Sequence, residues 1–439
     1  MRIGIVANEP SGDQLAASLI RALRELRPEA SFIGVAGPRM QAAGCVTLVD
    51  QERLAVMGLV AVLRHLPEVL RLRRQLGDYF LAHPPDLFVG VDAPDFNLTL
   101  ERRLRLAGIP TAHLVSPTVW AWRPGRVKGL RRAVDLVLSI FPFEEAFLRA
   151  RGVPVRYIGH PLADDIPLAT DRIAARQALG LPTAGPVIAL LPGSRTSEIG
   201  LLARPFLETA AWCLARRPEL RFVVPLVSPR LRTLFEKVLA ESGLGPSFAL
   251  ASPAAVTTGN GTSQGVTPRI NAAADGTRRK KPHPPSATAK HDSPWGEEVK
   301  PPPASTLQLI DGQGREAMTA ADLVLSASGT ATLEALLLQR PLVVGYRVDP
   351  LTYWLVKTLK LIKVPHVAMA NLLAGEELAP EFLQDRCRAE LMGPALLALL
   401  DDPAQVTAIR ATYARIHGEL RQDASRQAAQ ALLELVPGG

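Results

Sequence analysis

Hydrophobic and polar residues follow one another in a repeating order along this chain. A short apolar run is followed by a turn rich in Gly, Ser, Pro or Asp, and then by a longer segment that mixes apolar and charged residues. Short apolar runs are typical of buried parallel strands, and the longer segments of helices that cover a sheet. In the first part of the chain we therefore expect helices near 14–26 and 62–82, and strands near 2–7, 32–37, 86–91, 111–115, 135–140 and 155–159.

The same order begins again after a turn-like run at 159–164. It predicts strands near 186–191, 221–227, 307–311, 321–325 and 341–346, and helices near 201–217, 230–242, 315–319, 333–338, 351–361, 388–401 and 403–434. Alternating strands and helices predict an α/β fold. We expect one half at 1–160 and a second at 161–251 with 307–439, which is the layout of a two-domain enzyme with a cleft. The last helix is expected to pack back on the first half or on a partner.

Residues 252–306 interrupt the second half with a different composition. They are rich in Pro, Gly, Ser, Thr and Ala, carry a basic run at 278–281, and contain almost no large apolar side chains. Such a stretch cannot bury a core, so we interpret it as a low-complexity, disordered insertion.

The amino-acid composition limits the classes of partner and the cellular location that we expect for this protein. The 439 residues are 47% hydrophobic, which is ample for a large core, yet no apolar run is long enough for a transmembrane helix and no signal peptide is expected. The odd number of cysteines (Cys45, Cys213 and Cys387) fits a reducing cytoplasm, and we expect neither a metal nor a cofactor. The net charge of +8 favours anionic partners such as nucleotide phosphates or a membrane surface. Aromatic residues do not interleave with Arg and Lys, so nucleic acid is not expected.

Two turns in the second half are candidates for binding phosphate. A predicted strand ends at Ser326, and Ser328, Gly329 and Thr330 then lead into a helix that carries Glu334 one turn further on. Backbone N–H groups at a helix N-terminus suit a phosphate, and Glu334 could accept hydrogen bonds from sugar hydroxyls. The alternative is an ordinary capped helix. Arg195 follows another strand through a Gly-Ser turn, where it could meet a diphosphate with both arms of its guanidinium.

Carboxylates gather in the first half. Glu9 and Asp13 follow the first strand, and Asp92 and Asp95 follow the strand at 86–91. Ligands of open α/β sheets bind beyond the carboxyl ends of the strands, so these acids could supply a general base or bind a cation. Asp13 could equally be a first-turn helix acid. We expect one of Asp92 and Asp95 to cap the next helix and the other to act in function.

A basic, apolar segment and two tryptophans remain open to two interpretations. The run 56–63 continues through Leu66 and Leu70 between several arginines, so it could lie on a membrane, or it could be a domain-facing helix with solvated arginines. Trp120 and Trp122 stand in a loop beside a basic helix, where they could grip a lipid or a sugar, or could belong to the core.

Several motifs together resemble a known family. These are Ser11–Asp13, Val35–Met40, Leu54–Gly58, Val91–Asn97, Val119–Arg123, Leu191–Arg195, Ala327–Thr330 and Asn371–Gly375. In this order they resemble lipid-A-disaccharide synthase over nearly the whole chain except 252–306. The resemblance implies a glycosyltransferase-B fold, with two Rossmann-like domains facing each other across a cleft. It implies transfer of diacylated glucosamine from UDP to a diacylglucosamine 1-phosphate acceptor (lipid X), with inversion and without a metal. It also implies a homodimer with exchanged C-terminal segments, peripheral to the inner membrane of Gram-negative bacteria.

The resemblance also implies roles for particular residues. Asp92 matches the expected base, with Glu9 and Asp95 beside it in the catalytic group. Arg195 matches the arginine of the UDP site, and the nucleotide contacts are Ser328, Gly329, Thr330, Glu334 and Asn371. The first turn departs from the usual Gly-Glu-Ala-Ser-Gly-Asp at Asn8 and Pro10 but keeps the acids. The insertion at 252–306 has no expected counterpart.

Two other functions would also fit parts of this sequence. One is a UDP-sugar epimerase on the same fold, against which the apolar, Arg-flanked segment argues. The other is a non-enzymatic membrane-associated binding protein, against which the joint presence of Glu9, Asp92, Asp95 and Arg195 argues.

Overall fold

The computed structural model describes residues 1–51, 59–120, 124–248, 305–349, 353, 358 and 366–436, without the side chains of 59–65 and 124. The predicted insertion, apart from residues 305–306, and most of the predicted helix at 351–361 lie outside the described residues.

The first unit is built on a seven-stranded parallel sheet in the order β3-β2-β1-β4-β5-β6-β7. Its strands are β1 (Arg2–Ala7), β2 (Ser31–Ala36), β3 (Cys45–Asp50), β4 (Leu87–Val91), β5 (Thr111–Leu114), β6 (Leu136–Ser139) and β7 (Val155–Tyr157). The helices that cover it are α1 (Pro10–Leu26), α2 (Pro38–Ala42), α3 (Leu59–Ala82), α4 (Pro94–Leu106), α5 (Val127–Ala133) and α6 (Pro142–Arg149), with the short 3-10 turn η2 (Pro124–Arg126) before α5.

The second unit repeats this plan with a six-stranded parallel sheet in the order β10-β9-β8-β11-β12-β13. Its strands are β8 (Val187–Leu191), β9 (Arg221–Leu226), β10 (Leu307–Asp311), β11 (Leu323–Ser326), β12 (Leu342–Tyr346) and β13 (Glu381–Leu383). Its helices are α8 (Arg172–Ala178), α9 (Thr196–Leu214), α10 (Pro229–Ser242), α11 (Gly314–Ala320), α12 (Thr330–Leu337), α14 (Met369–Ala374), α15 (Ala389–Asp401) and α16 (Pro403–Leu420).

Strand order reverses once in each sheet, between β1 and β4 and between β8 and β11. The paired strands end level with each other, because Ala7 pairs with Val91 and Leu191 pairs with Ser326. In open α/β sheets the reversal leaves a crevice at the carboxyl ends, since the next connections leave on opposite faces. The fold therefore provides one ligand position in each unit.

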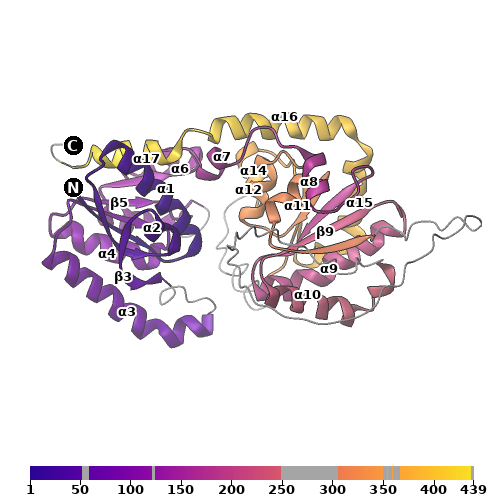
Figure 1. Ribbon diagram of the computed structural model, residues 1–439, viewed down its shortest axis with the longest axis horizontal. Coiled ribbons are helices and arrows are strands. Elements are labelled where there is room, and N and C mark those ends of the chain that lie inside the picture. The colour runs from indigo at the N-terminus through magenta and orange to yellow at the C-terminus, as the bar shows by residue number, and fades with distance from the viewer. Residues whose placement is uncertain are drawn as a thin grey trace, which may run out of the picture.

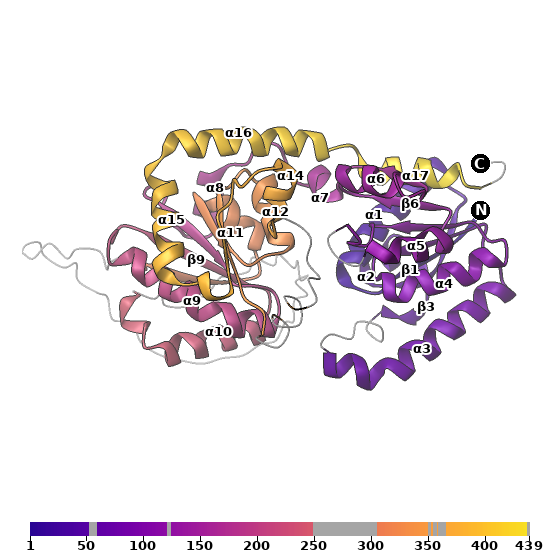
Figure 2. The same cartoon turned by 180° about the vertical axis from the view of Figure 1, so that it is seen from behind.

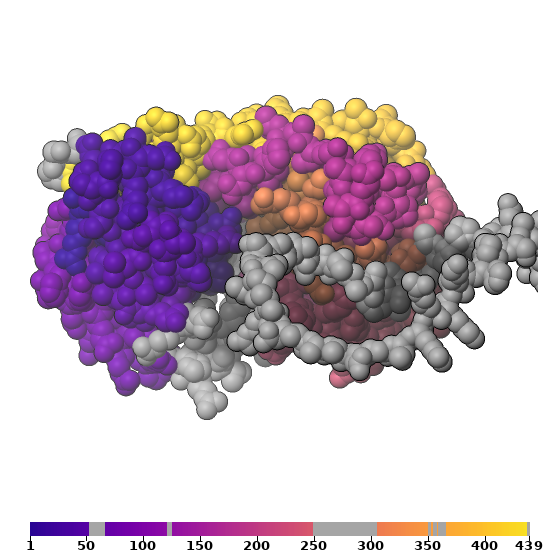
Figure 3. All heavy atoms as spheres, in the orientation of Figure 1, coloured from indigo at the N-terminus to yellow at the C-terminus, as the bar shows by residue number. Residues whose placement is uncertain are grey.

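The two units lie side by side and are joined by two crossings (Figures 1 and 2). One is α7 (Pro161–Asp165). The other is the C-terminal segment, in which α16 lies along the second unit and α17 (Ala424–Leu433) packs against α1 of the first. Figure 3 shows this segment as a yellow band over both units. The crossings touch each other, because the N–H of His160 donates to Leu420 O (2.8 Å) and His417 Nε2 lies 2.9 Å from Ala163 O.

The prediction of one helix over 403–434 is wrong. The helix ends at Leu420, and α17 begins at Ala424 after Asp423, whose φ is +56°. No Gly or Pro marks this break. Instead the Asp164 carboxylate accepts hydrogen bonds from the N–H groups of Asp423 and Ala424 (2.9 and 2.7 Å). The carboxylate belongs to α7, so a tertiary contact satisfies the exposed amides and fixes the break.

The edge strand β3 and strand β13 are also absent from the predicted elements. β3 has several exposed and half-buried positions, and β13 has three residues, so neither gives the continuous apolar run of a central strand. None of the helices within the described residues is long and apolar enough to cross a bilayer.

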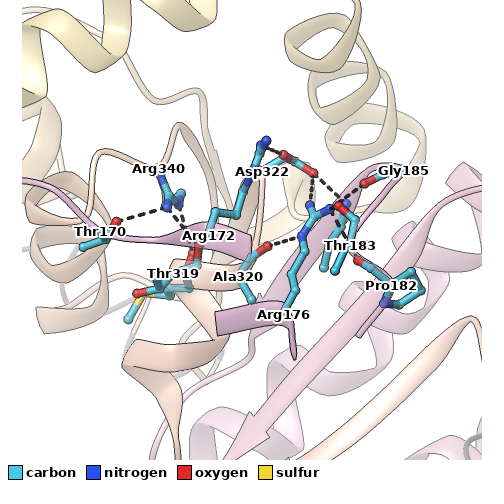
Figure 4. Close-up of polar contacts among 12 residues, drawn as sticks. Thr170, Arg172, Arg176, Pro182, Thr183, Gly185, Thr319, Ala320, Asp322 and Arg340 are labelled. Carbon is cyan, nitrogen blue, oxygen red and sulfur yellow. Dashed lines mark hydrogen bonds and ion pairs between the residues drawn. The ribbon is translucent and has the colours of Figure 1, made fainter. Parts of the chain in front are cut away.

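A buried arginine ties the second unit together at the edge opposite its ligand position (Figure 4). Arg176, on α8, is 2% exposed, and its guanidinium donates to the carbonyls of Ala320, Thr183 and Gly185 (2.8–3.0 Å). It also pairs with Asp322 (2.7 Å), which accepts the N–H of Val187. One side chain thus connects α8, the end of α11 and the starts of β8 and β11.

Candidate active site

The first ligand position begins at the end of β1. Glu9 is exposed there, and its carbonyl accepts the N–H of Asp13 at the start of α1 (2.9 Å). The buried amide of Gln51 donates to the carbonyls of Ala7 and Glu9 (3.1 and 2.9 Å). This amide holds the turn in shape and leaves the Glu9 side chain at the carboxyl edge of the sheet.

Asp92 lies directly beyond β4 in a strained turn. Asp92 and Ala93 have φ values of +52° and +43°, and left-handed backbone at a residue other than Gly costs about 1–3 kcal/mol. The N–H of Asp92 donates to Leu114 O (2.9 Å), and Asn97 Nδ2, which is fully buried, donates to Asp92 O (2.8 Å). These contacts hold the strained turn and present a half-buried carboxylate beside the β1 turn.

Asp95 lies one residue into α4 and has different surroundings. Its side chain is 80% exposed and forms an ion pair with Arg126 of η2 (2.5 Å). Neither Asp95 nor Asp92 caps α4, because the N-cap is Ala93 and no side chain accepts there. The prediction that one of the two acids is the cap is therefore wrong.

Asp13 has a structural role. It is buried, and its carboxylate accepts the N–H groups of Arg39 and Met40 at the start of α2 (both 3.0 Å). A Cβ at Gly37, the N-cap of α2, would lie 2.5 Å from the Asp13 carboxyl carbon. The close approach of α2 thus requires glycine there and removes Asp13 from the ligand position.

Arg195 lies at the corresponding point of the second unit. It follows β8 and Gly193, whose φ is +123°, and is 57% exposed at the start of α9. Glu198 accepts from its guanidinium (3.1 Å) and from the N–H groups of Ser194 and Arg195 (2.8 and 3.2 Å). Glu198 thus shapes the turn and holds Arg195 while leaving much of the guanidinium exposed.

The end of β11 forms the other side of this position. Gly329 is exposed at φ +133° with open space around its Cα, and Thr330, also exposed, begins α12. No side chain of the described residues accepts a hydrogen bond from the start of this helix, and the N–H of Thr332 donates to Gly329 O (3.1 Å). Ser328 Oγ donates to Val367 O (3.1 Å) and Thr332 Oγ1 accepts from Met369 N (3.1 Å), which ties the turn to α14.

Glu334 is half-buried one turn into α12. Burial raises the pKa of its carboxyl, while the nearby Arg315 counteracts this. A half-buried carboxyl at this depth can accept hydrogen bonds from ribose hydroxyls.

Asn371, a predicted nucleotide contact, forms side-chain hydrogen bonds within the protein. Its side chain is fully buried, and Nδ2 donates to Ala379 O and Glu381 (2.7 and 2.9 Å). Oδ1 accepts the N–H groups of Leu378 and Ala379 (2.9 and 2.8 Å). All of its hydrogen-bonding capacity is used within the protein. Asn371 therefore holds the segment at Leu378 and Ala379 against α14.

Four residues that shape these turns escaped the sequence analysis: Gln51, Asn97, Glu198 and Glu381. The Glu381 carboxylate, for example, accepts the N–H groups of Val367 and Ala368 (3.0 and 2.9 Å) at the start of α14. Asn97 and Glu198 lie within a few residues of a predicted strand end and could have been suspected. Gln51 and Glu381 come from segments whose proximity only the fold creates.

Solved structures share this architecture. The UDP-GlcNAc 2-epimerase from Neisseria meningitidis bound to UDP-GlcNAc has a TM-score of 0.58 at 13% identity, with 99% of this chain and 100% of that chain covered. The calicheamicin glycosyltransferase CalG4 has a TM-score of 0.53 at 12% identity, with 99% and 98% covered. At these identities the likeness shows the fold alone. The chain has the glycosyltransferase-B fold, with two Rossmann-like domains, as predicted.

Closer relatives identify the family. The sequence profile of the lipid-A-disaccharide synthetase family matches residues 3–257 and 296–435. The lipid-A-disaccharide synthase of Azotobacter vinelandii is 46% identical over 436 residues (99% of this chain, 98% of the relative), and that of Alkalilimnicola ehrlichii is 44% identical over 440 residues (100% and 99%). This chain belongs to the lipid-A-disaccharide synthase family. It is a glycosyltransferase that forms the lipid A disaccharide.

The comparisons decide between the three functions considered above. The family suggested by the motifs is confirmed, and the epimerase and the non-enzymatic binding protein are wrong for this chain. The stretch 258–295, which the family profile does not match, lies within the predicted insertion.

Proposed function

We propose that this enzyme transfers 2,3-diacylglucosamine from UDP to the 6-hydroxyl of 2,3-diacylglucosamine 1-phosphate, with inversion at the anomeric carbon. The observation that carries the proposal is the different chemistry of the two ligand positions, where strand order reverses. Carboxylates lie at the position in the first unit, and a guanidinium and a helix start without a side-chain cap lie at the position in the second. A hydroxyl acceptor needs a base, and a departing diphosphate needs positive charge.

Each residue has a definite task in this reaction. The Asp92 carboxylate takes the proton of the 6-hydroxyl while its oxygen attacks the anomeric carbon, and Glu9 accepts a hydrogen bond from the acceptor sugar. The bond from the anomeric carbon to the diphosphate breaks, and the electron pair leaves with UDP. Arg195 and the N–H groups at the start of α12 compensate the charge, with Ser328 and Thr330 at the phosphates and Glu334 at the ribose. Asp95 holds Arg126 and stays outside the reaction.

Release of UDP from UDP-2,3-diacylglucosamine, measured with and without 2,3-diacylglucosamine 1-phosphate, tests this proposal. We expect release that depends on the acceptor, together with a disaccharide product. In Arg195→Ala we expect the donor KM to rise about tenfold or more, because the variant loses one charge-assisted hydrogen bond to the diphosphate. Equal UDP release without acceptor, or an unchanged donor KM in the variant, would contradict the assigned roles.

We further propose that α3 places the enzyme on an anionic membrane surface. In the first half of this helix Leu66 and Leu70 are 41% and 43% exposed, and Arg71 and Arg74 are exposed close by. Leu72, on another face of α3, packs into the core. Figures 1 and 2 show the helix along the margin of the first unit, away from α16. An apolar strip flanked by arginines suits the boundary between lipid headgroups and acyl chains.

The double variant Leu66→Glu, Leu70→Glu is expected to bind phosphatidylglycerol vesicles at least about tenfold more weakly, because two apolar side chains no longer enter the lipid. Co-sedimentation with vesicles measures this. Val227→Glu is the matched control, since Val227 is 59% exposed on the second unit and should leave binding unchanged. Equal loss in both variants would point to non-specific charge repulsion and contradict the proposal.

We also propose a homodimer formed by exchange of α17 between two copies. The break at 421–423 separates α17 from α16, and its contacts with α1, Asp164 and Arg156 could be made equally well by the same helix of a second copy. Sedimentation equilibrium of the full chain would show a dimer, whereas a monomer at all concentrations would contradict it.

A further inference from the structure

The turn that follows β5, residues 115–120, lies beside the Asp92 turn and takes no part in the proton transfer proposed for Asp92. Its first residue, Val115, has a φ of +75°, which is rare for a β-branched side chain. The N–H of Val115 donates to Leu138 O at the end of β6 (3.0 Å). Strained residues cluster at functional sites, because the surrounding structure must hold them in place. Here the strain occurs at the ends of two adjacent strands, β4 and β5.

The turn ends in a tryptophan that a buried carboxyl holds in place. Trp120 Nε1 donates to Glu144 Oε1 (3.0 Å), and the other oxygen accepts the N–H of Phe141 at the start of α6 (3.3 Å). Glu144 is 2% exposed, and burial raises the pKa of its carboxyl to about 8. Burying a carboxyl group costs free energy unless it is hydrogen-bonded. The hydrogen bond to Trp120 offsets part of this cost and fixes the orientation of the indole.

Trp120 packs on a second aromatic ring. Its ring meets Phe143 edge-on with 4.7 Å between the ring centroids, and Phe143 stacks on Phe141 at 5.6 Å. Phe141 is buried, whereas Trp120 and Phe143 are only half-buried. A second tether, the Arg126–Asp95 ion pair, joins η2, shortly after Trp120, to α4. The result is a partly exposed aromatic pair at the carboxyl edge of the first sheet, held in place by Glu144 and Phe141.

This pair follows the next two strands after β4, at the same edge of the sheet as Asp92. Trp120 follows β5 and Phe143 follows β6, which are one and two strands from β4, and neighbouring strands lie about 4.8 Å apart. The attacking hydroxyl must lie within about 3 Å of Asp92, so the rest of the acceptor sugar extends along this edge. The face of a pyranose ring that carries C–H groups is apolar and complements an aromatic surface, while its hydroxyls point outward to polar partners.

We propose that the Trp120–Phe143 pair is the surface on which the glucosamine ring of the acceptor rests, and that Glu144 is a positioning residue acting through Trp120. This assignment rests on the transfer reaction proposed above and adds the contact that orients the acceptor. The donor binds at the other unit and is independent of it.

Trp120→Leu tests the proposal, with Trp212→Leu as the matched control, because Trp212 is also half-buried but lies on α9 of the second unit. We expect Trp120→Leu to raise the acceptor KM about tenfold and to leave the donor KM unchanged within about twofold. Water-soluble glucosamine 1-phosphate, used as a competitive inhibitor, carries the ring without acyl chains. Its inhibition constant should rise by a similar factor in Trp120→Leu and stay unchanged in the control.

Glu144→Leu tests the positioning role. As a single variant, Glu144→Leu should raise the acceptor KM. In the double variant with Trp120→Leu, the acceptor KM should be no higher than in Trp120→Leu alone, whereas independent structural damage would raise it further. Calorimetric titration with UDP checks that each variant keeps a folded donor site.

An unchanged acceptor KM in Trp120→Leu would overturn the proposal. So would a raised acceptor KM without a change for glucosamine 1-phosphate, because the pair would then contact acyl chains. If the wild-type enzyme shows no acceptor-dependent UDP release, the transfer reaction itself is contradicted instead.

Discussion

Asp92→Asn is expected to lower kcat by about 10²- to 10⁴-fold, the usual contribution of a general base. Asparagine keeps the size of the side chain and tolerates left-handed backbone, so the strained turn at φ +52° should persist while the proton acceptor is lost. Steady-state rates with both lipid substrates measure the effect. The donor KM should change little, since Arg195 and the start of α12 are untouched.

Asp95→Asn is the matched control for this experiment. Its carboxylate is 80% exposed and paired with Arg126 on the surface, so we expect less than a tenfold effect, in line with the small energies of exposed ion pairs. A large loss in Asp95→Asn with normal turnover in Asp92→Asn would reverse the two assignments.

Arg176→Met is expected to lower the free energy of unfolding of the second unit by about 3–5 kcal/mol, because it leaves the carbonyls of Ala320, Thr183 and Gly185 without their donor and removes one of the two arginines that pair with the half-buried Asp322. Methionine retains much of the apolar volume of the side chain, so the loss reports the polar contacts drawn in Figure 4. Urea unfolding followed by circular dichroism measures it.

Arg204→Met provides the comparison. Arg204 is 64% exposed and pairs with Glu208 one helical turn away, so its loss should cost at most about 0.5 kcal/mol. If Arg176→Met cost no more than this control, the network around Asp322 would contribute little to the fold.

Much of the fold could be predicted from sequence because parallel strands buried on both faces leave continuous apolar runs. The run at 86–91 predicted β4 to within one residue. Elements that are stabilised by contacts with distant parts of the chain were harder to predict. The break before α17 depends on the Asp164 carboxylate, which lies about 260 residues earlier.

The candidate site could be predicted in part for the same reason. Asp92, Arg195 and Ser328 follow within four residues of the ends of apolar runs, and the rule that ligands bind beyond strand ends makes them candidates. The hydrogen bonds that the Asn371 amide forms with Ala379, Leu378 and Glu381 could not be predicted from its motif, because the fold brings these groups together.

The sequence by itself determined the α/β class, the two-unit repeat, the family and the positions of polar residues just after the strands. These follow from local periodicity and from motifs that are contiguous in the chain. The tertiary structure alone decided that β1 neighbours β4 and β8 neighbours β11, so that the turns after these strands lie next to each other in pairs. It also decided that Asp92 stands in a strained turn held by Asn97, and that Glu144 fixes Trp120. These relations join segments far apart in sequence, and their energies come from burial and hydrogen bonds that exist only once the sheet has formed.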